Sequence, residues 1–178
     1  VVKKTPRSQM PLDKDGNRAD FVVEDISLIN RMNPGVAYEM RLGSCELATR
    51  KRIREMYDAG KSIDEIYEYY AGFMKIVSPM TYHQVMDPSI DRKLAVEEIL
   101  ENGIDAKVPP SFGPLLLEAV KELTEKYPPC RGPIQLTTND GRKVWTEDVA
   151  EIGVMYMMLL ERVGDTFAAV NSAKRQHH

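Results

Sequence analysis

Apolar side chains in the middle of the chain recur every three or four residues, which is the spacing of one face of an α-helix. The first such segment follows Pro34-Gly35 and continues to Ala59-Gly60. Gly43 and Ser44 lie inside it and are poor helix formers, so the sequence leaves open one long helix or two. A helix is therefore predicted for the segment after residue 36, with an uncertain midpoint.

Three further helices are predicted downstream. The first, over residues 62–78, begins at a capping box in which Ser62 is followed three residues later by Glu65, and it ends before a proline. The second, over residues 91–102, is followed by a glycine that favours a left-handed cap. The third, over residues 115–127, is preceded by a proline suited to a first helical turn and is ended by two prolines.

Both ends of the chain have the composition of strands and turns. Residues 19–24 are rich in β-branched and aromatic side chains, which predicts a strand. Residues 134–138 and 143–146 flank Asn139-Asp140-Gly141, a strong signal for a β-hairpin. The apolar run over residues 152–160 fits a short helix or a strand buried on both faces, and its periodicity does not decide between them.

These elements predict an α+β fold for a chain of 178 residues, a length typical of one domain. Residues 1–36 and 131–178 are expected to form a β body together. Residues 37–130 are expected to form a helical insertion between its two parts.

The composition is that of an ordinary globular protein, with 43% hydrophobic and 29% charged residues. No apolar run approaches the roughly 20 residues that span a membrane, so no membrane partner is expected. Cys45 and Cys130 lie far apart without a neighbouring ligand pattern, which favours a reducing, cytoplasmic setting. The net charge of −3 argues against a protein whose whole surface binds nucleic acid.

Basic residues are concentrated locally at the two ends and in the first long helix. These residues are Lys3, Lys4, Arg7, Arg50, Lys51, Arg52, Arg54, Lys174 and Arg175. For the cluster over residues 50–54 we favour a solvated helix face over a phosphate-binding patch, because charge runs on helices usually face water.

Several catalytic patterns are absent from the sequence. It contains no glycine-rich phosphate loop, no HExxH, no GxSxG and no Asp-x-Asp-x-Asp cluster that could hold catalytic magnesium. His83 is expected in a loop without an acidic partner, and we do not expect it to be catalytic. No metal site is predicted in this chain, and chemistry is not expected to reside in it alone.

Residues 50–70 also resemble the first two elements of a helix-turn-helix, with a glycine turn before a short capped helix. A recognition helix needs basic or amide groups facing the groove, whereas Asp64, Glu65 and Glu68 make this helix acidic. A helical hairpin with a packing role is therefore favoured. A small DNA-binding or transcription-regulatory protein without catalysis remains the alternative function.

A set of short motifs follows one order along the chain. They are Val1-Val2-Lys3-Lys4, Met10-Pro11-Leu12, Asp15-Gly16-Asn17, Ala19-Asp20-Phe21-Val22-Val23, Asn30-Arg31-Met32-Asn33-Pro34-Gly35, Asp140-Gly141-Arg142 and Gly153-Val154-Met155-Tyr156-Met157-Met158-Leu159-Leu160. In order and approximate spacing they resemble the C-terminal part of the β subunit of multisubunit DNA-directed RNA polymerases. Each motif is moderately specific, but the resemblance covers nearly the whole chain.

Two departures indicate a divergent member of that family. Residues 24–30 replace the family's Asn-Pro-Leu-Gly-Val-Pro-Ser and lose two prolines and a glycine, which changes the expected shape of the loop before the arginine. Residues 159–162 replace a histidine-rich Lys-Leu-His-His. The divergence resembles a bacteriophage or split polymerase, active in the bacterial host cytoplasm or packaged in the virion.

The resemblance implies a supporting role in nucleotidyl transfer. The β body would be part of a double-psi barrel with its flanking strands. Arg31 matches the family's contact to the triphosphate of the incoming nucleotide, and Met32 and Asn33 would support that site. Lys3 and Lys4 would lie near the RNA or nucleotide. An arginine in a loop before a helix suits this role because its planar donors bind phosphate in pairs.

The resemblance also implies the cofactor and the partners. Mg²⁺ would be held by the β′-like subunit, and the remainder of β, the DNA template, the RNA and ribonucleoside triphosphates would complete the assembly. From the residues alone, a surface salt bridge between Arg31 and Glu24 or Asp25 remains the alternative role for the arginine.

Overall fold

The computed structural model describes residues 3–30, 34–106 and 115–155. Its helices are α1 (Asp25–Asn30), α2 (Pro34–Asp58), α3 (Ile63–Val77), α4 (Pro79–Val85), α5 (Arg92–Asn102) and α6 (Leu115–Lys126), after a 3₁₀ turn at Arg7–Gln9. Its strands are β1 (Arg131–Gly132), β2 (Gln135–Thr137), β3 (Lys143–Trp145) and β4 (Ala150–Glu151). The predicted α+β class is confirmed at this level, with helix far exceeding strand.

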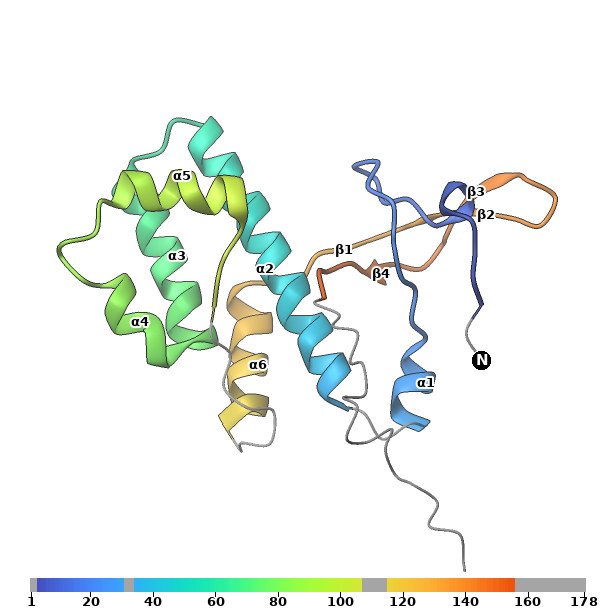
Figure 1. The fold of residues 1–178 in the computed structure, drawn as a ribbon, viewed down its shortest axis with the longest axis horizontal. Coiled ribbons are helices and arrows are strands. Elements are labelled where there is room, and N and C mark those ends of the chain that lie inside the picture. The colour runs from blue at the N-terminus through green and yellow to red at the C-terminus, as the bar shows by residue number, and fades with distance from the viewer. Residues whose placement is uncertain (1–2, 31–33, 107–114, 156–178) are drawn as a thin grey trace, which may run out of the picture.

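Helix α2 separates the two parts of the molecule (Figure 1). Helices α3, α4 and α5 group on one side of it, and the four strands lie on the other side. The predicted helix after Pro34 is confirmed, and it runs through Gly43 and Ser44 without a break. No helix in the described ranges is long and apolar enough to cross a membrane.

The turn between α2 and α3 follows from local sequence signals. Gly60 adopts a φ of 70°, and the Lys61 N–H donates to the Met56 carbonyl while the Gly60 N–H donates to that of Tyr57, which is a Schellman ending. The Ser62 hydroxyl then accepts the backbone N–H of Glu65 at 3.2 Å, so the predicted N-cap is confirmed.

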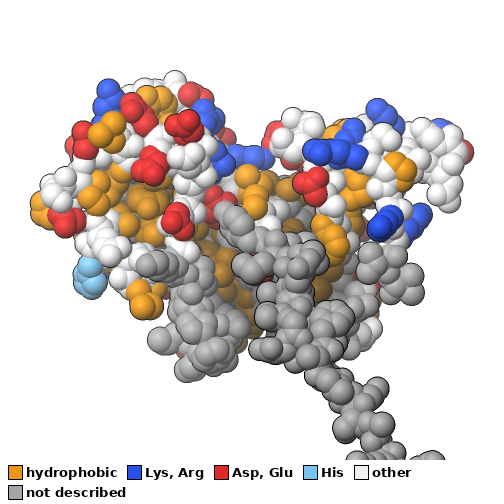
Figure 2. Space-filling view, viewed as in Figure 1, with side chains coloured by type: hydrophobic (Ala, Val, Ile, Leu, Met, Phe, Trp, Pro, Cys, Tyr) orange, Lys and Arg blue, Asp and Glu red, His pale blue; other side chains and the backbone are white. Residues whose placement is uncertain are grey.

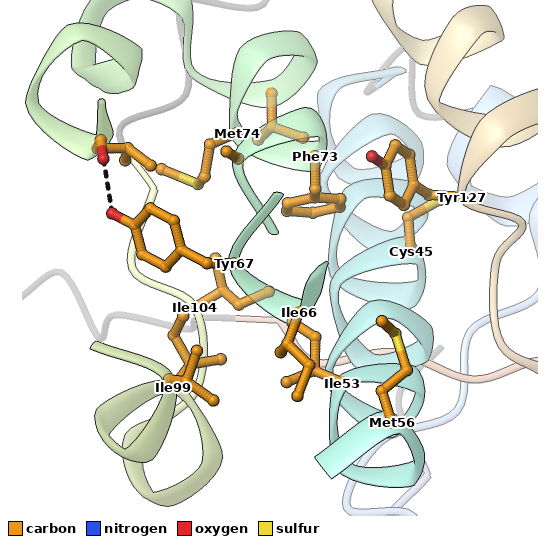
Figure 3. Close-up of a cluster of buried hydrophobic side chains, with 14 of the residues drawn as sticks. Cys45, Ile53, Met56, Ile66, Tyr67, Phe73, Met74, Ile99, Ile104 and Tyr127 are labelled. Atoms are coloured by element: carbon orange, nitrogen blue, oxygen red, sulfur yellow. Dashed lines mark hydrogen bonds between the residues drawn. The ribbon is translucent and has the colours of Figure 1, made fainter. Parts of the chain in front are cut away.

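Helix α3 is the centre of the hydrophobic core. It packs against α2, α4, α5 and α6, and six of its residues are buried: Ile66, Tyr67, Ala71, Phe73, Met74 and Val77. Figure 3 shows Phe73 beside the ring of Tyr127, and the two centroids are 5.4 Å apart with nearly perpendicular planes. The Tyr67 hydroxyl donates to the Val85 carbonyl at 2.6 Å, which satisfies the one polar atom of that buried ring.

Helix α4 was not predicted from the sequence. Pro79 occupies its first turn, where a missing N–H costs nothing, and the chain continues as a helix to Val85. His83 therefore lies in a helix, and the expectation that it lies in a loop is wrong. Helix α5 ends as predicted at Asn102, where Gly103 has a φ of 94°.

The strands form two antiparallel ladders, β1 with β4 and β2 with β3. The hairpin of β2 and β3 around Gly141 confirms the signal of Asn139-Asp140-Gly141. The strand predicted at residues 19–24 is wrong: that segment joins no ladder, and its Phe21 and Val22 are exposed. Apolar β-branched and aromatic content alone does not make a strand without a partner segment to accept its hydrogen bonds.

Leu12 joins the N-terminal segment of the chain to the strands that follow α6. Its N–H donates to the Gln135 carbonyl at 3.0 Å, and the Gln135 N–H donates back at 2.7 Å. A second bridge joins Leu12 to Arg18. The β part is therefore built from both ends, and among the described residues it forms short ladders and bridges without closing into a barrel.

Candidate functional site

The residues predicted to bind nucleotide follow directly after α1. Arg31, Met32 and Asn33 lie outside the described residues, whereas Asn30 ends α1 and Pro34 begins α2. The expected passage from a strand to a helix is wrong, because the arginine follows one helix and precedes another. The two prolines and the glycine absent from residues 24–30 are the residues that would prevent a helix there.

The start of α1 shows how that short helix forms. The Ser27 N–H donates to the Glu24 carbonyl at 3.0 Å, and its hydroxyl donates to the Glu24 carboxylate at 3.3 Å. Glu24 thus has a local partner, although it was one of two candidates for a salt bridge with Arg31.

Lys3 and Lys4 are described and exposed. Neither makes a hydrogen bond or an ion pair with another residue in the described ranges. Their ammonium groups are accessible to an anion.

Helix α2 contacts the β part through a series of side chains on one of its faces. The Arg41 Nε lies 2.8 Å from a Glu151 carboxylate oxygen, and the Ser44 hydroxyl donates to the Cys130 carbonyl at 3.1 Å. About two turns farther along the helix, the Lys51 ammonium forms an ion pair with Asp15. Spacings of three and seven residues place these side chains on one side of a helix. We call this set of contacts the α2 junction.

Two glycines allow the closest approach in the α2 junction. A Cβ atom on Gly153 would lie 2.6 Å from the Ser44 nitrogen and 3.0 Å from the Met40 carbonyl oxygen. A Cβ atom on Gly43 would overlap the carbonyl of Val154 and lie 3.1 Å from its carbon. Backbone therefore packs on backbone where residues 153 and 154 cross α2, which only glycine permits.

The ion pair of Lys51 and Asp15 joins the turn over residues 13–17 to α2. The hydrogen bond from Lys51 lowers the pKa of Asp15 below its ordinary 3.8, and the bond to Asp15 raises the pKa of Lys51 above 10.5. The carboxylate contributes stability above pH 3.8 that is lost as the pH falls through its lowered pKa. The ammonium contributes stability below pH 10.5 that is lost as the pH rises through its raised pKa. The pair is fully charged across the neutral range.

Cys45, which follows Ser44 on α2, is buried and 0% exposed. Burial raises the pKa of this thiol from 9.0 to about 11, because the interior disfavours the thiolate. Since the thiolate is the reactive form, we expect iodoacetamide at pH 8 to modify the partly exposed Cys130 and to spare Cys45 until the protein is unfolded in urea. Peptide mass spectrometry measures both rates. Equal rates in the folded protein would contradict the packing of this helix.

The burial of the Cys45 thiol also predicts a decrease in folding stability at alkaline pH. The unfolded thiol ionises from about pH 9 and the folded one only near pH 11, so this group's contribution is intact below pH 9 and decreases as the pH rises toward 11.

The basic cluster over residues 50–54 is largely occupied by structural contacts. Arg50 donates to the carbonyls of Leu100 and Glu101 at 3.1 and 2.9 Å, and Arg54 donates to that of Leu100 at 2.7 Å. Both arginines thus cap the C-terminus of α5, where cations are favoured. The interpretation as a solvated face holds only in part, since one side of the cluster joins helices α2 and α5.

The geometry also bears on the helix-turn-helix alternative. Helix α3 packs against four other helices. The exposed side chains of its N-terminal half include Asp64, Glu65 and Glu68. These carboxylates would repel a phosphate backbone. No specific observation favours a DNA-reading role for this helix.

Within the described residues, no group of three or more His, Cys, Asp or Glu side chains is placed to hold a metal ion. No protein-family model matches the chain.

Sequence reasoning missed Arg41 and Glu151 as members of the α2 junction, because no local motif connects two residues so far apart in the chain.

Proposed function

We propose that the chain is the C-terminal part of a β-type subunit of a bacteriophage-type, multisubunit DNA-dependent RNA polymerase. It would support template-directed nucleotidyl transfer and would not be catalytic alone. The observation that carries the proposal is the pairing of Leu12 with Gln135. This pairing brings the Met10-Pro11-Leu12 motif beside the hairpin of the Asp140-Gly141-Arg142 motif, as expected if the ordered motifs belong to one folded unit.

Further support comes from the α2 junction. The glycine that begins the motif at residues 153–160 packs directly on α2, the helix that follows the Arg31 motif. The ion pair of Lys51 with Asp15 adds the Asp15-Gly16-Asn17 motif, so three motifs of the proposed family are linked through one helix. We propose that the paired segments belong to a double-psi barrel completed by chain outside the described residues.

The distribution of charge supports one orientation of the chain toward nucleic acid. Over residues 61–106 acidic side chains outnumber basic ones, whereas over residues 3–20 basic side chains outnumber acidic ones. Figure 2 shows the same trend on one face, with Asp and Glu more frequent over the helical part and Lys and Arg more frequent over the β part. The helical insertion would thus face away from nucleic acid, and the N-terminal segment would face toward it.

The proposed role of Arg31 is electrostatic. During nucleotide addition the pyrophosphate leaves, and negative charge grows on its oxygens. A guanidinium fixed at that position stabilises the charge more in the transition state than in the ground state, because it is already oriented when the charge develops. Met32 and Asn33 would support the loop, and Lys3 and Lys4 would lie beside the RNA or nucleotide.

Mg²⁺ would bind to carboxylates of the β′-like partner and supply the activation of the attacking hydroxyl. The described residues of this chain offer no carboxylate group suited to it. The remainder of β, the DNA template, the RNA and ribonucleoside triphosphates are the other proposed partners.

The proposal is tested by native affinity purification of the full chain from cells that express the complete set of polymerase genes. We expect co-purification with a second large polypeptide that carries an Asp-x-Asp-x-Asp sequence. Recovery of the chain alone, bound sequence-specifically to duplex DNA, would support the regulatory alternative and contradict the proposal.

A further inference from the structure

Trp145 is the only tryptophan of the chain, and it ends β3 with 50% of its surface exposed. Its hairpin lies at the end of the molecule farthest from α3, α4 and α5 (Figure 1). Within the part of the chain that the structure describes, no aromatic ring or cation packs against the indole. Tryptophan is highly buried on average, so the surroundings of this exposed ring are informative.

The β2–β3 hairpin divides its side chains between two different faces, because paired residues of an antiparallel ladder lie on the same face. The ladder places Leu136 and Val144 together on one face. The other face, which we call the Trp145 face, carries the side chains of Gln135, Thr137, Lys143 and Trp145. A protein-docking surface concentrates apolar side chains at its centre, whereas the Trp145 face combines one aromatic ring with polar and cationic groups.

The polar groups of the Trp145 face have no partner in the described ranges. The side chains of Gln135 and Thr137 make no hydrogen bond there, in contrast to the neighbouring Thr138 and Thr146. Lys143 is exposed and forms no ion pair, whereas Arg142 beside it is paired with Asp140. The amide, the hydroxyl and the ammonium are thus available to a ligand beside the ring.

The charge around the hairpin favours a polyanion. Four carboxylates of residues 3–20 and 131–151 are already paired with cations, namely those of Asp15, Asp20, Asp140 and Glu151. The cations of these segments without a carboxylate partner in the described ranges are Lys3, Lys4, Lys14, Arg18 and Lys143. The carboxylates without a cation there are Asp13, Glu147 and Asp148. The unpaired charge of the β part is therefore mainly positive.

We propose that the Trp145 face binds single-stranded RNA, with one base stacked on Trp145 and a phosphate beside Lys143. An aromatic ring next to cations suits a single strand, whose bases are free to stack on a side chain, more than a duplex, whose bases stack on each other. Gln135 and Thr137 supply groups for the 2′-hydroxyl that distinguishes RNA from DNA. The choice of RNA rests on the proposed function, in which RNA is the product.

The unique tryptophan gives a direct readout of the proposed contact. The full chain is titrated with an oligouridylate of about 12 nucleotides, a length within the usual site sizes of single-strand binders, while the emission of Trp145 is recorded. We expect saturable quenching, because the stacked base contacts the ring. The deoxy oligonucleotide of the same sequence should bind about fivefold more weakly, the effect of one lost hydrogen bond. Unchanged emission would assign the exposed ring to a contact with another protein and overturn the inference, and equal affinity for DNA would also overturn it.

Substitutions of Trp145 test the stacking itself, with affinity measured by the anisotropy of a labelled oligouridylate. Trp145→Ala should weaken binding by about 10- to 100-fold, and Trp145→Phe, which keeps a ring, should weaken it less. Val144→Thr is the matched control, since Val144 is the exposed neighbour on the opposite face of the hairpin. Circular dichroism checks that each variant folds. Full affinity in Trp145→Ala, or an equal loss in Val144→Thr, would contradict the proposal.

Lys143→Gln tests the phosphate contact without removing the ring. Each phosphate contact to a single strand contributes about −0.7 to the slope of log affinity against log salt concentration, so this variant should make the slope shallower by about that amount. Lys121→Gln is its control, because Lys121 is exposed on α6 and forms no ion pair in the described ranges. The same slope in Lys143→Gln and the unmodified chain would remove Lys143 from the interface.

The RNA titration and the co-purification experiment fail independently. If the chain co-purifies with polymerase subunits and RNA does not quench Trp145, only the RNA-binding face is wrong. If RNA quenches Trp145 but the chain is recovered without a second large subunit, the RNA-binding face stands and the assignment to a polymerase fails.

Discussion

Replacing Arg31 by alanine in the assembled enzyme is expected to lower kcat/KM for nucleotide addition by about 10²-fold, while binding of the template changes little. The reason is that a preoriented donor acting on developing charge contributes a few kcal/mol to the transition state, and each 1.4 kcal/mol is a factor of ten. Single-nucleotide addition, measured over a range of nucleotide concentrations on a preformed elongation complex, gives both constants.

Two companion variants sharpen this result. Arg31→Lys keeps the charge but loses the planar pair of donors, so it should recover only part of the activity. Arg52→Ala removes an exposed arginine of α2 that is paired with Glu55 at 2.9 Å, and it should behave as the unmodified chain. An unchanged nucleotide dependence in Arg31→Ala would remove this residue from the site.

Gly43→Ala is expected to destabilise the folded chain by about 1–3 kcal/mol, the usual cost of inserting a methyl group into packed structure. The direction is informative, because alanine in the middle of a helix is normally more stable than glycine by about 1 kcal/mol. Here the added methyl would overlap the Val154 carbonyl, and backbone cannot move aside as a side chain can. Urea denaturation followed by circular dichroism measures the change in free energy of unfolding.

Gly132→Ala is the matched control for this prediction. A Cβ atom at Gly132 meets nothing within 4 Å, so the substitution should change stability by less than about 0.5 kcal/mol. If Gly43→Ala proved as stable as the unmodified chain or more so, the crossing of residues 153 and 154 over α2 would be wrong.

The helical part of the fold was largely predictable from the sequence, because its signals are local. Ser62 with Glu65, Gly60 and Gly103 each mark a helix end through bonds within a few residues, and the structure places each as expected. Helix α4 escaped prediction because it is a single short element in which Pro79, taken as a terminator, is instead a first-turn residue.

The β part was predictable only where its pairing is local. The hairpin around Gly141 needs no distant partner, whereas residues 19–24 would need one, and their strand did not form. The bridge of Leu12 to Gln135 depends on a contact across most of the chain, which periodicity cannot reveal. The order of family-like motifs indicated that the two ends belong together.

The candidate site shows the same division. The resemblance singled out Arg31, Met32, Asn33, Lys3 and Lys4, and of these only the two lysines lie within the described residues. The side chains that fix α2 were not foreseen. Nothing in the sequence distinguishes Arg41 and Glu151 from other charged residues. They become partners only because the β1–β4 ladder places Glu151 against α2.

The central claim is that this chain is part of an RNA-synthesising machine, and template-directed RNA synthesis by the purified complex tests it most directly. The account predicts that the complex containing this chain incorporates ribonucleotides in a template- and Mg²⁺-dependent manner, and that a complex prepared without the chain does not. Equal RNA synthesis by the complex that lacks the chain would contradict it.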